Sequence, residues 1–119
     1  MTRASLVPVL RNYALAVQAS VSPTGAPQAA VVGFAVTDAL EIIFDTVATS
    51  RKYHNLRVDP RIALVVGWEH EITVQIEGVA DVPVGDELER VRATSPRIRT
   101  GASGLPGRAS PISACDRPG

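Results

Sequence analysis

The sequence has little of what several classes of protein require. Cys115 is the only cysteine among 119 residues, which excludes an internal disulfide and leaves no second thiol for a zinc site or a redox pair. Aromatic residues make up 4% of the chain, too few for the stacking platforms of a single-stranded nucleic-acid binder. Pro8, Arg11 and Asn12 break the N-terminal apolar segment well short of a signal peptide or membrane helix. We therefore expect a cytoplasmic protein that binds neither membranes nor nucleic acid.

Net charge is also absent, because 12 basic and 12 acidic side chains balance. Any attraction for an anion must then come from a local cluster. The balance conceals two unlike segments: residues 1–91 hold 7 cations and 11 anions, whereas residues 92–119 hold 5 cations and 1 anion. A chain of this length fits one domain with a modest core, which we place in residues 1–91.

Residues 92–119 have an atypical, basic and low-complexity composition, in which Arg, Gly, Pro, Ser and Ala fill 21 of 28 positions. Neither strand nor helix periodicity is visible there, so no core element is expected. Two interpretations compete. The segment is either a natural disordered tail or the product of a frame shift that replaced the original C-terminal strands, and the composition favours the frame shift.

Short apolar segments separated by turn residues run through the first 91 positions and predict strands. Gly78 interrupts one alternating pattern, which predicts a β-bulge. A helix is predicted over residues 50–58, where Tyr53 and Leu56 are three apart, and another is predicted to begin within "VGDELERVR". The fold class is therefore mainly β (α+β), a small barrel with short helices, and the predicted strands are "LAVQASV", "QAAVVGFAV", "LEIIFD", "RIALVVGW" and "EITVQIEG".

Two cations open the first of these helices. Thr49 or Ser50 suits the N-cap, and Arg51 and Lys52 follow in the first turn. Cations oppose the helix dipole at this end, so their presence makes sense if a phosphate completes the site. The alternative is that they are solvated surface charges, balanced by Asp45 and Asp59.

No constellation for metal or acid–base chemistry stands out. His54 and His70 are separated by a helix end and a whole strand, without the spacing of metal ligands, so no metal site is expected. A bound cofactor could nevertheless perform the chemistry, since in flavin enzymes the protein mainly supplies position and electrostatics.

The stretch "FDTVATSRKYHNLRVDPRIALVVGW" with "EITVQIEGVAD" resembles the pyridoxamine 5′-phosphate oxidase-like family of FMN-binding split barrels, over about residues 15–90. The resemblance implies a split β-barrel whose C-terminal strands could be missing here. It also implies a homodimer with FMN at the subunit interface and a flavin-dependent oxidoreductase acting on a small-molecule substrate or reductant. The implied cofactor-binding residues are Ser50, Arg51 and Lys52 at the phosphate, Thr49 beside them, and Phe44, Asp45, Thr46, Val31 and Val32 near the ring.

Thr73 or Gln75 could also reach the flavin edge, although an outward polar face explains them equally well. The vitamin B6 oxidases of the family carry an Arg and a Lys on the second strand, where this chain has only apolar residues from Ala29 to Phe34. The cofactor therefore stays open between FMN and F420. A non-catalytic protein that binds flavin or F420 is the alternative function, and the substrate and catalytic residues are undetermined.

Overall fold

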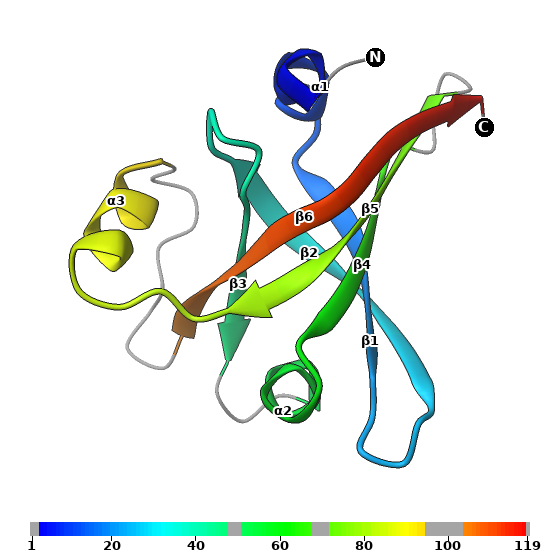
Figure 1. Cartoon of the computed structure of the whole chain (residues 1–119), viewed down its shortest axis with the longest axis vertical. Coiled ribbons are helices and arrows are strands. Elements are labelled where there is room, and N and C mark those ends of the chain that lie inside the picture. The colour runs from blue at the N-terminus through cyan, green and yellow to red at the C-terminus, as the bar shows by residue number, and fades with distance from the viewer. Residues whose placement is uncertain (1–2, 48–50, 68–71, 95–103, 119) are drawn as a thin grey trace.

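The computed structural model describes residues 3–47, 51–67, 72–94 and 104–118. These residues form three short helices and six strands (Figure 1). The helices are α1 (Arg3–Leu10), α2 (Arg51–Val58) and α3 (Asp86–Thr94). The strands are β1 (Leu15–Val21), β2 (Pro27–Val36), β3 (Ile42–Val47), β4 (Arg61–Val66), β5 (Ile72–Asp81) and β6 (Gly104–Pro118).

The six strands close into a barrel in the order β1-β2-β3-β6-β5-β4, and every neighbouring pair is antiparallel. This confirms the predicted mainly-β barrel with short helices. The predicted bulge is also confirmed, because the register of β5 on β6 shifts between Glu77 and Gly78. Because the barrel is closed, each of the six described strands has a neighbour on both sides, which protects it from pairing with other chains.

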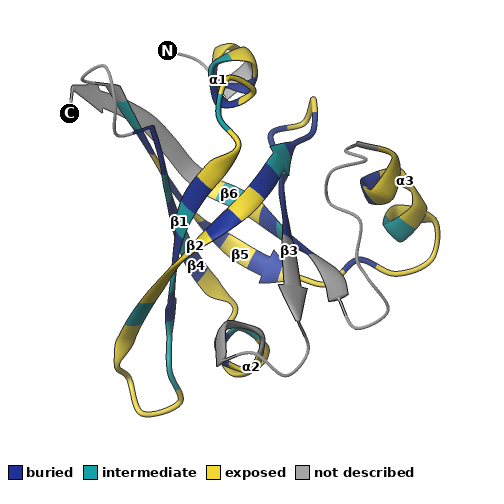
Figure 2. Ribbon diagram, turned by 180° about the vertical axis from the view of Figure 1, so that it is seen from behind, coloured by how far each residue is buried: buried dark blue, intermediate teal, exposed yellow. Residues whose placement is uncertain are grey.

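The core lies inside the barrel, and buried residues alternate with more exposed ones along strands such as β1 and β4 (Figure 2). β3 contributes Ile42 and Phe44, and β4 contributes Leu64 and Val66, all at most 1% exposed. α1 adds Leu6 and Leu10, so this helix covers one end of the barrel and does not stand apart from it. The sequence analysis did not predict α1.

β6 occupies the segment for which the sequence predicts no regular structure. It pairs with β3 from Ile42↔Ala109 to Val47↔Gly104 and with β5 from Ile72↔Pro118 to Asp81↔Arg108. The strand is long, at 15 residues, and joins the two halves of the barrel. The origin of residues 92–119, natural or frame-shifted, stays a prediction.

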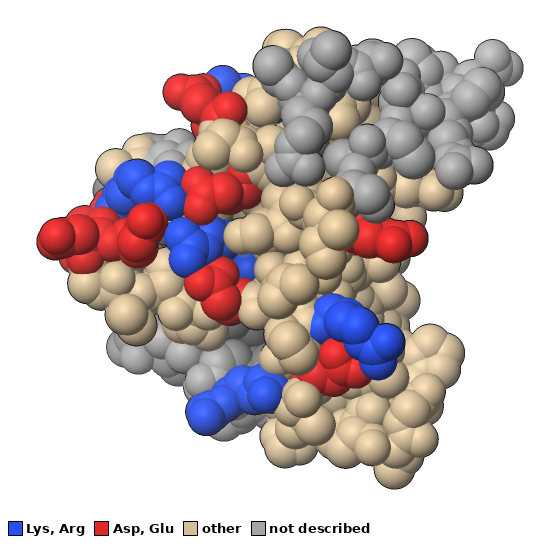
Figure 3. Space-filling model, viewed as in Figure 1, with Lys and Arg blue, Asp and Glu red and all other residues tan. Residues whose placement is uncertain are grey.

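A network of ion pairs fastens α3 to the barrel, and Figure 3 shows opposite charges gathered on this side. Arg108 of β6 donates to Asp81 at 2.5 and 2.9 Å and to Glu41 at 3.2 Å. Arg90 of α3 holds both oxygens of Glu41, at 2.8 and 2.9 Å, and also bonds Glu87. The bond from Arg90 is the main cause that lowers the pKa of Glu41, and burial only partly offsets it.

Candidate functional site

The candidate site begins where the chain leaves β3 and enters α2. Arg51 and Lys52 form the start of α2, and its first turn has no acidic residue. The predicted helix over 50–58 is therefore observed from residue 51. Thr49 and Ser50 lie outside the described residues, so the predicted N-cap does as well. The backbone places two adjacent cationic residues at the end of a helix where free N–H groups favour anions.

Asn55 fixes α2 against the first hairpin of the barrel. Its side chain is 3% exposed, and its amide nitrogen donates to Gln28 at 2.6 Å and to Ser20 at 3.3 Å. Leu56, the next residue, packs against the core. Because both strands of the hairpin hold this turn of the helix, the start of α2 has a set position relative to β2.

A local ion pair forms directly after the end of α2. Arg61 donates to both oxygens of Asp59, at 2.6 Å in the shortest contact. These hydrogen bonds lower the pKa of Asp59 to about 2. The charge of Asp59 is therefore neutralised by Arg61. This weakens the interpretation that Asp59 neutralises the charges of Arg51 and Lys52.

An apolar row crosses the outer face of the barrel beside this helix. The registers place Val31 of β2 opposite Val17, Val17 opposite Val65, and Val65 opposite Gln75. Val31 is 61% exposed, and Val17 and Val65 are half-buried. Phe34 pairs with Phe44 in β3, and continuing that register brings Val31 level with Val47, where β3 ends before α2. The outer surface of β2 thus offers apolar residues at the level of the end of β3.

The predicted ring neighbours divide between the two faces of the sheet. Val31 points outward, whereas the side chains of Val32 and Phe44 are buried in the core at 5% and 1% exposure. Val32 and Phe44 could therefore contact a ligand on the outer face only through their backbone. Asp45 and Thr46 lie on β3, paired with Pro106 and Leu105 of β6.

Thr73 and Gln75 lie on the outer face of β5, the first half-buried and the second exposed. They share the outer face with Val31, but β1 and β4 stand between β5 and β2. At about 4.8 Å per strand, three strand spacings separate them by roughly 14 Å. One chain alone does not bring these polar residues beside Val31.

The described residues offer no group of three or more His, Cys, Asp and Glu that could hold a metal ion. His54 is exposed on α2, and His70 lies outside the described residues. Nor does any helix within the described ranges have the length and apolar character to cross a membrane. In their chemistry, the two cationic residues at the start of α2 and the exposed Val31 on β2 fit a cofactor that carries a phosphate and a planar ring.

Comparison with known proteins identifies the same architecture. A family model described as pyridoxamine 5′-phosphate oxidase matches residues 4–112. A pyridoxamine 5′-phosphate oxidase-related, FMN-binding protein from Nostoc punctiforme has a TM-score of 0.69 at 11% identity, with 96% of this chain and 78% of that chain covered. A heme-binding protein from Mycobacterium smegmatis has a TM-score of 0.79 at 16% identity, over 99% of this chain and 58% of that chain.

General Stress Protein 26 from Bacillus anthracis also shares the fold, with a TM-score of 0.74 at 15% identity over 98% of this chain and 93% of that chain. At such identities the structural matches establish the fold alone. No curated protein matches the sequence.

Proposed function

The chain belongs to the pyridoxamine 5′-phosphate oxidase family, and from that premise we propose that it is an FMN-dependent oxidoreductase that works as a homodimer. The observation that carries the proposal is the pair Arg51 and Lys52 at the start of α2, without an acidic residue in that turn. Continuing the register of β2 on β3 brings the exposed Val31 of β2 level with Val47, at the end of β3 that precedes α2. A phosphate and a planar ring are the two parts of a ligand that such a surface suits.

In the proposed complex, Arg51, Lys52 and Ser50 bind the phosphate, with Thr49 beside them. The backbone N–H groups at the helix start add to the attraction of the two cations. The ring lies along the outer surface of β2 at Val31, with the end of β3 at Asp45 and Thr46 along one side. Val32 and Phe44 contribute backbone contacts and keep the wall rigid through their buried side chains. When bound, FMN supplies a ring that accepts and returns a hydride.

The apolar outer row supports the proposed dimer. Val31, Val17 and Val65 expose apolar surface on three adjacent strands, and a second copy could cover it. Thr73 and Gln75 lie too far from β2 to reach the same ring within one chain. In a two-fold dimer they could approach the ring held by the partner subunit, which places the cofactor at the interface.

The alternative functions share the fold and the surface. An F420-dependent reductase would use the same phosphate anchor. A non-catalytic binder of flavin or F420, or of heme as in the Mycobacterium smegmatis protein, would need no substrate chemistry. Reduction of the loaded protein by NADH or NADPH separates the enzyme from the non-catalytic binders, because only an enzyme brings a reductant to the ring.

The test is a titration of the purified, cofactor-stripped protein with FMN, followed by the quenching of flavin fluorescence. We expect Arg51→Ala with Lys52→Ala to weaken binding by roughly 100-fold, since each charge-assisted phosphate contact contributes about 1.5 kcal/mol. Arg11→Ala with Arg92→Ala removes two half-exposed cations outside α2 and the residues next to it, and serves as the matched control. Equal affinity in both double variants, with unchanged circular dichroism, would return Arg51 and Lys52 to the solvated-surface interpretation.

A further inference from the structure

α3 is attached to the outside of the barrel, apart from the main core. Among residues 86–93, only the side chain of Val91 is buried. It packs against Ile43 of β3, with Ala35 of β2 beside them, in a small cluster separate from the core inside the barrel. The neighbouring side chains of α3 are exposed, except for the half-buried Leu88. The helix could therefore leave the barrel without opening the main core.

Ion pairs hold α3 in this position. Arg90 of α3 donates to both oxygens of Glu41, at 2.8 and 2.9 Å. Glu87 of α3 accepts a bond from Arg108 of β6 at 3.3 Å. Glu41 and Arg108 are each only 15% exposed, so these pairs are partly shielded from water. The attachment of α3 thus combines one small apolar cluster with charged contacts.

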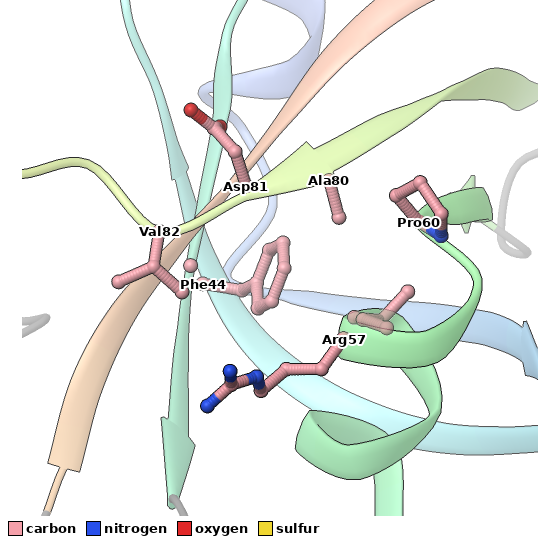
Figure 4. A pocket seen from close by; sticks show the side chains of 8 residues that line it. Phe44, Arg57, Pro60, Ala80, Asp81 and Val82 are labelled. Carbon is pink, nitrogen blue, oxygen red and sulfur yellow. The ribbon is translucent and has the colours of Figure 1, made fainter.

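The barrel side of this network has contacts that do not involve α3. Arg108 donates to Asp81, the last residue of β5, at 2.5 and 2.9 Å, and to Glu41 at 3.2 Å. In Figure 4 the carboxylate of Asp81 points away from Phe44 and the pocket that this ring lines. Because Arg108 and Glu41 hold each other, the groups that bind α3 keep their places when the helix moves away.

The chain enters α3 through a joint with little packing around it. Gly85, the residue before the helix, has a φ of +63°, and a Cβ atom there would meet nothing within 4 Å. Val84 beside it is 75% exposed. A rotation at this joint displaces few neighbouring atoms, as expected of a hinge at the end of an element.

α3 covers one end of the outer face of β2. Residues 31, 33 and 35 share this face, because successive side chains of a strand alternate. Val31 is 61% exposed and Gly33 is exposed, whereas Ala35 is partly buried in the cluster with Val91. From residue 31 to residue 35 the strand runs roughly 13 Å. Without α3, one apolar strip would extend from Val31 to Ala35 and Ile43.

We propose that α3 is a lid over this end of the strip, held shut by the ion pairs of Arg90 and Glu87 with the barrel. When the pairs break, Val91 leaves Ile43 and the helix swings at Gly85, while the barrel stays closed. Opening lengthens the apolar surface that a flat ligand on β2 meets, and closing excludes water from its end. The lid itself does not depend on a flavin, whereas its control of ligand entry rests on the proposed function.

Thiol labelling of the full chain measures the opening. Cys115→Ser removes the natural cysteine, and Ile43→Cys then places a thiol beneath Val91. Ile42→Cys is the matched control, since Ile42 is also fully buried but belongs to the main core. We expect N-ethylmaleimide, an uncharged reagent, to react roughly tenfold faster in the Ile43→Cys protein, because local opening costs less than opening the barrel. Equal rates at the two positions would overturn the proposal.

Charge variants test what holds the lid. Arg90→Gln should speed the labelling of the Ile43→Cys protein by roughly fivefold, the factor that such an ion pair contributes to an equilibrium, and should leave the core control unchanged. Arg92→Gln is the matched control, because its partner Glu89 lies on α3 itself. Adding Glu41→Gln to Arg90→Gln should multiply the rate by less than Glu41→Gln does alone, since the two residues share one contact. Equal rates in the Arg90→Gln and Arg92→Gln proteins would overturn the role of the network.

Hydrogen exchange tests the same opening without a substitution in either cluster. The amides of residues 86–94 should exchange roughly fivefold faster in the Arg90→Gln protein, while those of β4 and β5 stay unchanged. The association rate of FMN should rise by a similar factor, because the open fraction rises. Faster exchange with an unchanged association rate would overturn the control of ligand entry. If neither protein binds FMN but Arg90→Gln still speeds exchange, the flavin proposal fails and the lid stands.

Discussion

The substitution Gly107→Ala tests most sharply whether β6 closes the barrel and packs against Phe44. The added Cβ would meet three carbons of the Phe44 ring at 2.3, 2.6 and 2.9 Å, so the two must separate by roughly 1 Å to reach ordinary contact. The ring is 1% exposed and cannot swing into solvent. Overpacking of this kind costs about 1–3 kcal/mol, and the lower entropy of unfolded alanine returns a few tenths or more. A net loss of about 1–2 kcal/mol follows.

Thermal unfolding followed by circular dichroism measures this loss. For a chain of this size, about 4 °C of Tm corresponds to each kcal/mol, so we expect a fall of roughly 4–8 °C. Gly33→Ala is the control, because its nearest neighbour would be an ordinary contact at 3.9 Å. Phe44→Leu should remove most of the cost of Gly107→Ala when the two are combined. A Tm unchanged by Gly107→Ala would mean that residues 104–118 do not close the barrel.

Three further results are expected. Gln18 is 1% exposed, and neither polar atom of its side chain has a hydrogen-bond partner among the described residues, so Gln18→Met should raise the free energy of unfolding by about 1–3 kcal/mol. A loss of stability in urea unfolding would mean that a buried water satisfies the amide. The folded pKa of Glu41 lies below its usual value, so its contribution is present above about pH 4.5 and is lost as pH falls through the folded pKa. Glu41→Gln should therefore flatten the decline in Tm below pH 4.5, and an equally steep decline would refute the role given to Arg90. Val31→Asp should convert the proposed dimer to monomers in sedimentation, while Val84→Asp, also exposed, should not. A dimer that survives Val31→Asp would exclude this face as the interface.

The sequence predicts the barrel best where turns and alternation agree. "LAVQASV" corresponds residue for residue to β1, and the change of pattern at Gly78 marks a bulge that is present. These patterns are local, because the turn residues and the period of two act within a few positions. The start of α2 was placed within one residue for the same reason.

The two missed elements depend on distant contacts. Pro8 and the nearby Arg11 and Asn12 obscure α1, which forms because Leu6 and Leu10 bury against the barrel. β6 lacks an apolar alternation because its inward positions must be small: Gly107 lies against Phe44, and Ala109 is fully buried. Its stability comes from pairing with strands on both sides, which no local pattern reveals.

The candidate site also contains residues that the sequence reveals and residues that only the folded structure reveals. Arg51 and Lys52 are visible in the sequence because cations are unusual at a helix start. The inward direction of Val32 and Phe44 depends on which face of each strand meets the core, and only the register establishes it. Arg108 and Asp81 went unnoticed because one lies in the basic segment and the other ends a strand 27 residues earlier.

The most direct test of cofactor binding is the visible absorption spectrum of the purified protein, with the mass of the molecule it releases on denaturation. We predict a yellow protein that releases FMN, and that loses the colour in the variant with Arg51→Ala and Lys52→Ala. Release of F420 would keep the phosphate anchor and change the cofactor. A folded protein that is colourless, and that stays so after incubation with excess FMN or F420, would contradict the proposed function.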